Sequence, residues 1–104
     1  MAQRELAGKT IEVDNEGYMT DIKQWTKEIA AALAKNQGID VLTDKHWQVI
    51  DYLRGKYEEG VSLSLRKVGK SGIVGIKEFY ALFPDGPLKK ATLIGGLPKP
   101  ESCV

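Results

Sequence analysis

The first part of the chain alternates polar and apolar residues. Residues 9–13 (KTIEV) alternate polar and apolar side chains, with Ile11 and Val13 apolar, which is typical of a strand with one buried face. Residues 14–17 (DNEG) are turn formers. The pattern therefore predicts a β-hairpin whose return strand contains Tyr18 and Met19. The polar residues 1–8 are expected to be frayed.

From about residue 20 onward, apolar residues recur three or four positions apart, which is the period of an amphipathic α-helix. The aromatic residues at this spacing are expected to lie in the core: Trp25, Trp47, Phe79, Tyr80 and Phe83. Helices are predicted over about residues 20–38, 43–60, 62–70, 76–83 and 87–94. The fold class is thus mainly α, a small helical bundle of about five short helices with an N-terminal β-hairpin.

The predicted ends of these helices rest on capping residues. Thr43 and Ser62 are suited to be N-caps, and Pro87 fits the first position of the last helix. Residues 97–104 (LPKPESCV) contain two prolines, which favour extended geometry. We expect one domain, residues 1–104, in which residues 97–104 form a mobile C-terminal arm.

Composition and charge exclude several classes of protein. Hydrophobic residues make up 42% of the chain and charged residues 28%, as in an ordinary globular protein. The 15 basic and 14 acidic residues nearly cancel, so direct nucleic-acid binding is not favoured. No transmembrane or signal segment is evident, so a cytoplasmic protein without membrane partners is expected. One cysteine and one histidine leave too few ligands for zinc, and no cofactor is expected.

The strongest candidate for chemistry is Cys103, a lone thiol next to the C-terminal residue. On an arm, such a thiol can enter another protein's active site, although a terminal cysteine can also be incidental. Lys99 favours the thiolate, whereas Glu101 and the terminal carboxylate oppose it. This balance suits a thiol that receives sulfur already activated on a donor better than an independent nucleophile.

Other polar residues give weaker signals. His46 has no serine or carboxylate placed in the sequence to complete a triad, so a structural or surface role is favoured. Arg66, Lys67 and Lys70 form a basic cluster that could contact RNA phosphates or an acidic partner, although a solvated helix face is the simpler interpretation. Arg66 and Lys99 are kept as candidate partner contacts.

Two C-terminal stretches, FPDGP (83–87) and GLPKPESCV (96–104), closely resemble the DsrC/TusE family. The segment LTDKHW (42–47) and the run of Leu53, Arg54 and Tyr57 also resemble this family, so the likeness covers nearly the whole chain. The resemblance implies a helical fold that opens with a hairpin. It also implies a mobile arm whose penultimate cysteine, here Cys103, receives sulfur and passes it on.

The resemblance also separates two branches. Members tied to dissimilatory sulfite reductase carry a second cysteine earlier on the arm, and the matching position here is Thr92. One thiol cannot close an internal disulfide. The single-cysteine pattern is similar to TusE-like members, which accept persulfide sulfur from a TusBCD-type or DsrEFH-like donor complex and pass it toward a tRNA thiolating enzyme that makes 2-thiouridine. A sulfurtransferase-type persulfide carrier that acts with partner proteins is therefore the leading hypothesis, and whether it is an enzyme in its own right stays open.

Two alternatives stay open. A DsrC-like partner in dissimilatory sulfur metabolism, with sulfite reductase as acceptor or in sulfur oxidation, has the same chemistry with other partners. A helical nucleic-acid-binding or regulatory module would share the fold pattern, because several short helices with a hairpin can resemble a winged helix-turn-helix. The near-neutral charge counts against this module.

Overall fold

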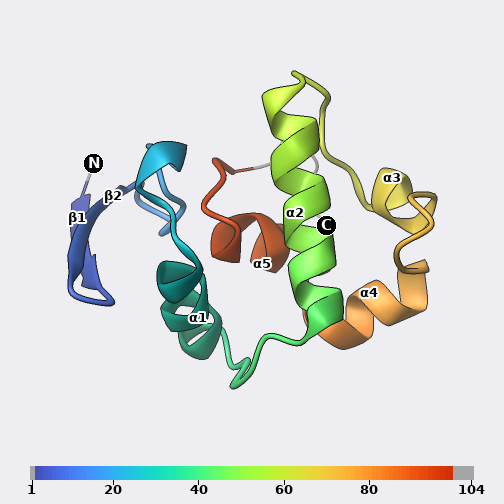
Figure 1. The fold of residues 1–104 in the computed structure, drawn as a ribbon, viewed down its shortest axis with the longest axis horizontal. Coiled ribbons are helices and arrows are strands. Elements are labelled where there is room, and N and C mark those ends of the chain that lie inside the picture. The colour runs from blue at the N-terminus through green and yellow to red at the C-terminus, as the bar shows by residue number, and fades with distance from the viewer. Residues whose placement is uncertain (1, 100–104) are drawn as a thin grey trace.

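The computed structural model describes residues 2–99, and the predictions that concern residues 100–104, including Cys103, lie outside this part. Its α5 lies between α1 and α2, with α3 and α4 beyond α2 and the hairpin beyond α1 (Figure 1). The predicted class, mainly α with an N-terminal hairpin, is confirmed. The elements are β1 (Ala2–Leu6), β2 (Lys9–Val13), a 3₁₀ helix (Ile22–Gln24), α1 (Lys27–Asn36), α2 (Asp44–Glu58), α3 (Leu65–Gly69), α4 (Ile76–Leu82) and α5 (Pro87–Ile94).

The hairpin uses a different pair of strands from the predicted pair. β1 pairs antiparallel with β2, in a register that sets Leu6 opposite Lys9. The two loop residues between them, Ala7 and Gly8, have φ values of 52° and 77°, as a two-residue hairpin turn requires. The predicted frayed segment is therefore a strand. The predicted return strand is reduced to one bridge between Val13 and Met19.

The first long helix starts later than predicted. The chain forms a 3₁₀ helix first and then takes an extended conformation at Trp25, with φ −70° and ψ 138°. Thr26 then caps α1, because its Oγ1 accepts the N–H of Ile29 at 3.2 Å. The apolar period continues through Trp25, but the backbone helix does not, and this break turns the indole toward the end of α5.

α2 begins after its predicted cap, Thr43, and His46 lies in its first turn. His46 is 6% exposed. Its Nδ1 accepts the backbone N–H of Thr43 at 3.0 Å, which leaves Nε2 to donate to the carbonyl of Leu82 at 2.8 Å. The ring also packs edge-on against Phe83, with centroids 5.0 Å apart. His46 thus connects α2 to the end of α4. Of the two roles predicted for it, structural or surface, the structural one is confirmed.

Two further predictions are wrong in detail. Ser64, rather than Ser62, caps α3, and its Oγ accepts the N–H of Lys67 at 3.1 Å. Tyr80 is 44% exposed, so it is a surface residue and not part of the core. The other predicted core aromatics are buried or partly buried against the core: Phe79, Phe83, Trp25 and Trp47.

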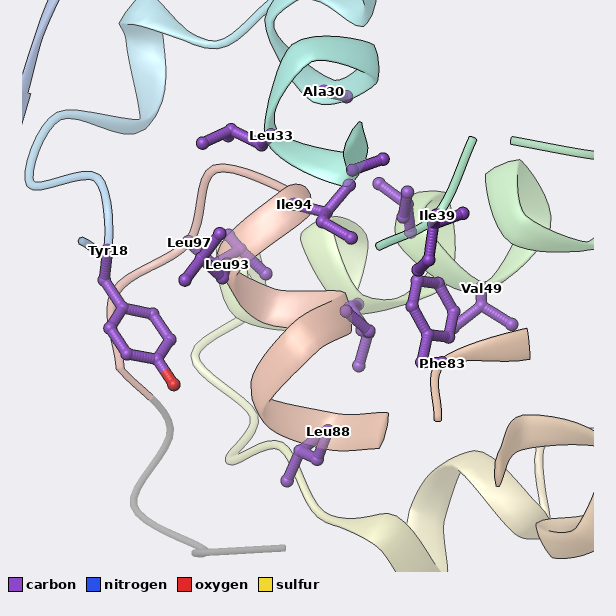
Figure 2. Close-up of a cluster of buried hydrophobic side chains, with 14 of the residues drawn as sticks. Tyr18, Ala30, Leu33, Ile39, Val49, Phe83, Leu88, Leu93, Ile94 and Leu97 are labelled. Atoms are coloured by element: carbon purple, nitrogen blue, oxygen red, sulfur yellow. The ribbon is translucent and has the colours of Figure 1, made fainter. Parts of the chain in front are cut away.

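α5 is the central element of the core. Apolar side chains from several elements surround it, including Leu33, Ile39, Val49 and Tyr18 (Figure 2). Every residue from 91 to 97 is buried, including two glycines. The helix that leads into the C-terminal segment is therefore the most enclosed of the fold. No helix within residues 2–99 combines the length and apolar character needed to cross a membrane.

Candidate functional site

The described part of the chain approaches Cys103 through the C-terminal end of α5. There the N–H of Gly96 bonds to the carbonyl of Leu93 at 3.2 Å, and the N–H of Leu97 bonds to the carbonyl of Thr92 at 3.0 Å. Gly96 has a φ of 70°, in the left-handed region. These features together form a Schellman motif, which satisfies two of the carbonyls that a helix end leaves without intrahelical partners. The helix therefore stops sharply at the base of the C-terminal segment.

Side chains from distant elements bind the next two carbonyls. The indole Nε1 of Trp25 donates to the carbonyl of Ile94 at 2.8 Å, and Nη1 of Arg54 donates to the carbonyl of Gly95 at 2.6 Å. Arg54 Nη2 also donates to the carbonyl of Ile22 at 3.3 Å. The turn after α5 is thus bonded both to the segment before α1 and to α2.

Trp25 and Arg54 also support each other. The guanidinium carbon of Arg54 lies 4.2 Å from the centroid of the Trp25 ring, a cation–π geometry. Burial lowers the pKa of the Arg54 guanidinium from its ordinary value, and the carboxylates of Glu58 and Asp51 act in the opposite direction. Because arginine ordinarily titrates above about pH 12, the group keeps its charge at neutral pH.

The turn depends on the lack of a side chain at Gly96. A Cβ built there would lie 2.7 Å from the Cβ of Trp25 and closer still to its ring. Any larger residue would therefore both strain the positive φ and displace the indole. The Trp25 side chain is thus packed against Gly96 with no room for a Cβ.

The described residues after the turn remain attached to the body. Leu97 is 1% exposed and belongs to the core. The exposed Lys99 places its Nζ 2.9 Å and 3.0 Å from the two carboxylate oxygens of Glu16. Pro98 and Lys99 also line a groove of about 280 Å³ with residues 60–63. The mobility predicted for residues 97–104 stays a prediction. Leu97, the first residue of this segment, is packed in the core.

Thr92, the position that carries a second cysteine in some relatives according to the sequence resemblance, is fully buried. Its Oγ1 donates to the carbonyl of Leu88 at 2.8 Å and lies 3.0 Å from the carbonyl of Lys89. The side chain is therefore used within α5.

The remaining predicted contact, Arg66, is exposed on α3 and lines neither the groove beside Pro98 nor the other large groove on which Lys99 lies. The structure thus does not bring Arg66 and Lys99 into one site. Lys67, its neighbour in the basic cluster, donates to the carbonyl of Ser62 at 2.9 Å. Within residues 2–99, no cluster of three or more histidine, cysteine, aspartate or glutamate side chains is arranged to hold a metal ion.

Comparison with known proteins places this architecture. A family model described as DsrC like protein matches residues 5–104. The chain belongs to this DsrC-like family. The sulfurtransferase TusE of Escherichia coli strain K12 is 40% identical over 105 residues, which cover 93% of this chain and 95% of that protein. The family resemblance seen in the sequence is confirmed, and the name sulfurtransferase agrees with the predicted transfer of sulfur.

Solved structures agree with the DsrC-like fold. The crystal structure of dissimilatory sulfite reductase I (DsrI) matches with a TM-score of 0.87 and 35% identity, and it covers 99% of this chain and 100% of that chain. The NMR structure of Allochromatium vinosum DsrC matches with a TM-score of 0.83 and 36% identity, and it covers 98% and 97% of the two chains. The match with these structures therefore spans nearly the full length of this chain and of theirs.

Arg54 was noted in the sequence as part of the family resemblance, but its role at the α5 turn comes from the structure. Arg54→Met keeps the aliphatic stem and removes both carbonyl bonds, so we expect a loss of about 2 kcal/mol of unfolding free energy. Urea denaturation measures this loss, and hydrogen exchange should show faster exchange at the Leu97 amide. A lysine has no planar guanidinium to bond both carbonyls at once, so the unfolding free energy of Arg54→Lys should lie between those of the wild type and Arg54→Met. Unchanged exchange at Leu97 would contradict this role for Arg54.

Proposed function

We propose that this protein is a sulfur carrier that accepts persulfide sulfur on Cys103 and surrenders it to a partner protein in tRNA 2-thiouridine synthesis. The observation that carries the proposal is the single thiol of a chain that matches relatives named sulfurtransferase over nearly its full length. The donor would be a TusBCD-type or DsrEFH-like complex, and the acceptor a tRNA thiolating enzyme. The relay would operate in the cytoplasm.

The proposed chemistry is thiol exchange in two balanced steps. The Cys103 thiolate attacks the outer sulfur of a donor persulfide, and the new S–S bond forms as the donor leaves as a thiolate. In the second step, a thiolate of the acceptor attacks the outer sulfur now held on Cys103, and Cys103 leaves as a thiolate. The sulfur atom is passed on with no net oxidation or reduction, so neither step requires a cofactor.

In this proposal the folded body and the C-terminal segment have separate roles, and the α5 turn is the boundary between them. Residues up to Leu97 are bonded or packed into the body, whereas the thiol lies beyond Pro98 and Pro100 in the sequence. In this proposal residues 97–104 act as the mobile arm, with Leu97 as its fixed end. The body would then dock on partners while the thiol enters their active sites.

The experiment is to incubate the reduced protein with a persulfide donor and to measure its mass. Transfer of one sulfur atom should add about 32 Da to the peptide that contains Cys103, and dithiothreitol should remove it. Loading should be tested with a protein donor and with polysulfide. Absence of the adduct with both would refute the proposed function.

A DsrC-like role in dissimilatory sulfur metabolism is the second candidate, because the solved structures that match this chain include dissimilatory sulfite reductase I (DsrI) and DsrC. Thr92 counts against it, since the resemblance implies a cysteine there for members that work with sulfite reductase. Binding assays separate the two roles. Our proposal expects binding to a tRNA thiolation complex, and selective binding to a sulfite reductase would favour the second role.

A further inference from the structure

Exposed hydrophobic side chains gather on α4. Ile76 is 47% exposed and Tyr80 44% exposed, and they lie four residues apart, which sets them on one face of the helix. Most large hydrophobic residues of the described chain are buried or half-buried, so two exposed neighbours on a seven-residue helix stand out. Two adjoining exposed apolar side chains are more typical of a contact surface than single, scattered ones are.

Basic side chains border this pair. Gly69 at the end of α3 abuts Ile76, because a Cβ on Gly69 would lie only 2.6 Å from Ile76 Cγ1. α3 and α4 are therefore packed side by side at one end of the molecule, far from the hairpin (Figure 1). Arg66 of α3 and Lys70, the C-cap residue that follows Gly69, are both exposed and lie four residues apart.

The charged residues on α3, at its C-cap and on α4 are mainly basic. Lys77 lies on α4 beside the exposed pair, and Lys45 of α2 reaches the same end of the molecule, where its Nζ donates to the carbonyl of Ile73 at 2.8 Å. Glu78, the acidic residue of α4, is two positions from both exposed hydrophobic residues and so lies about 200° around the helix from each. We call Arg66, Lys70, Ile76, Lys77 and Tyr80 the α3–α4 patch.

We infer that the α3–α4 patch docks a protein of the sulfur relay whose own surface presents an apolar pocket rimmed by carboxylates. An apolar centre that contains tyrosine, surrounded by arginine and lysine, is the usual composition of a protein interface. A carboxylate rim is the complement of the three cations of the patch, Arg66, Lys70 and Lys77, with Glu78 on another side of α4. A phosphate backbone offers no apolar surface for the aliphatic side chain of Ile76 to pack against. The net charge of +1 also gives little attraction to nucleic acid, so a protein partner is favoured over RNA.

This inference rests on the proposed function and adds the docking surface to it. The patch and the C-terminal segment occupy neighbouring elements, because α3 begins two residues after Leu63, which lines the groove beside Pro98 and Lys99. A partner that is seated on the patch and extends past the start of α3 would therefore reach the groove beside Pro98 and Lys99. Docking and sulfur transfer can then occur in one complex.

The test measures both half-reactions of the relay. Sulfur is loaded onto Cys103 from a persulfide-carrying TusBCD-type complex or from polysulfide, and is then delivered to the tRNA thiolating enzyme. Tyr80→Ala and the double variant Arg66→Glu with Lys70→Glu should slow at least one protein-dependent step by about tenfold or more, as loss of an interface anchor does. Loading from polysulfide should be unchanged. Salt should slow the wild-type step and have less effect on the double variant.

Matched controls come from exposed residues elsewhere on the chain. Val41→Ala removes a side chain that is 71% exposed outside the patch, and Lys23→Glu with Lys35→Glu repeats the charge reversal at the other end of the molecule. Both controls should transfer sulfur at the wild-type rate. Patch variants that keep both protein-dependent rates would overturn the inference, as would variants that lose only tRNA binding. Failure of both polysulfide and the protein donor to load Cys103 of the wild-type chain would instead refute the carrier function, and the inference with it.

Discussion

A Cys103→Ser chain is expected to take up no sulfur from any donor. A serine hydroxyl is not a nucleophile toward sulfane sulfur near neutral pH and cannot hold a persulfide, so the relay has no other carrier in a chain with one cysteine. The adduct of about 32 Da should vanish, and 2-thiouridine made by the reconstituted relay should fall to the level seen without the protein. Mass spectrometry and nucleoside analysis measure the two effects.

The matched control moves the thiol by one position, as Ser102→Cys combined with Cys103→Ser. This chain should load from polysulfide, because a thiol is present, but should deliver sulfur to the protein acceptor more slowly, because position matters for attack geometry. Thermal unfolding of each variant separates loss of chemistry from loss of fold. If the Cys103→Ser chain still supports 2-thiouridine synthesis, the function resides in the body and the carrier mechanism is wrong.

The largest effect on stability is expected from Gly96→Ala. The new Cβ would overlap the Trp25 side chain, and the positive φ of 70° adds backbone strain of about 1 kcal/mol or more. Relief requires the indole to move, which breaks its bond to the Ile94 carbonyl and its stacking with Arg54. We expect a total loss of at least about 3 kcal/mol, or a melting temperature lower by about 10 °C or more. Calorimetry or circular dichroism measures the change.

Gly38→Ala separates the two causes. Gly38 also has a positive φ, 84°, but a Cβ there would meet no atom within 4 Å. This control should therefore show the backbone strain alone, about 1 kcal/mol. If Gly96→Ala costs no more than Gly38→Ala, the Trp25 ring is free to shift and does not clamp the turn.

The helices that the sequence predicts best are those with strong local signals at both ends. α2 starts after Thr43 and α5 starts with Pro87 and ends before a Gly-Gly pair, and both were found close to their true bounds. The sequence predicts too early a start for α1, because its apolar period continues through Trp25, where the backbone is extended. Periodicity reports which side chains are buried and does not report whether the chain is helical at each one.

The sequence predicts one strand of the hairpin correctly, residues 9–13, but pairs it with the wrong partner for a related reason. β1 carries polar or partly exposed side chains at residues 3–6, so it lacks the apolar run that marks a strand. Its loop includes Ala7, which rarely adopts the positive φ it has here, so the usual Asn-Gly signal was missing. Tyr80 was assigned to the core because it follows a helical spacing, although it lies to one side of the buried face that Phe79 defines.

In the candidate site, too, some residues can be proposed from the sequence and others are found only in the structure. Cys103 can be proposed from the sequence because a lone thiol has distinctive chemistry wherever it lies, and it stays a prediction. The roles of Trp25 and Arg54 could not be identified, because both bind backbone carbonyls, and no sequence pattern shows which carbonyls a helix end leaves open. The ion pair between Lys99 and Glu16 joins residues far apart in the chain and was equally invisible.

In the proposed carrier, the fixed position of Leu97 limits how far sulfur on Cys103 can travel. From Leu97, a fully extended chain reaches Cys103 within about 20 Å, whatever path it takes. Because only residues 97–103 connect the thiol to the body, its effective concentration at the active site of a bound partner is on the order of millimolar. This holds even when the protein itself is scarce. The short connection also means that a partner whose reactive cysteine lies deeper than this radius cannot be served without unseating Leu97 from the core.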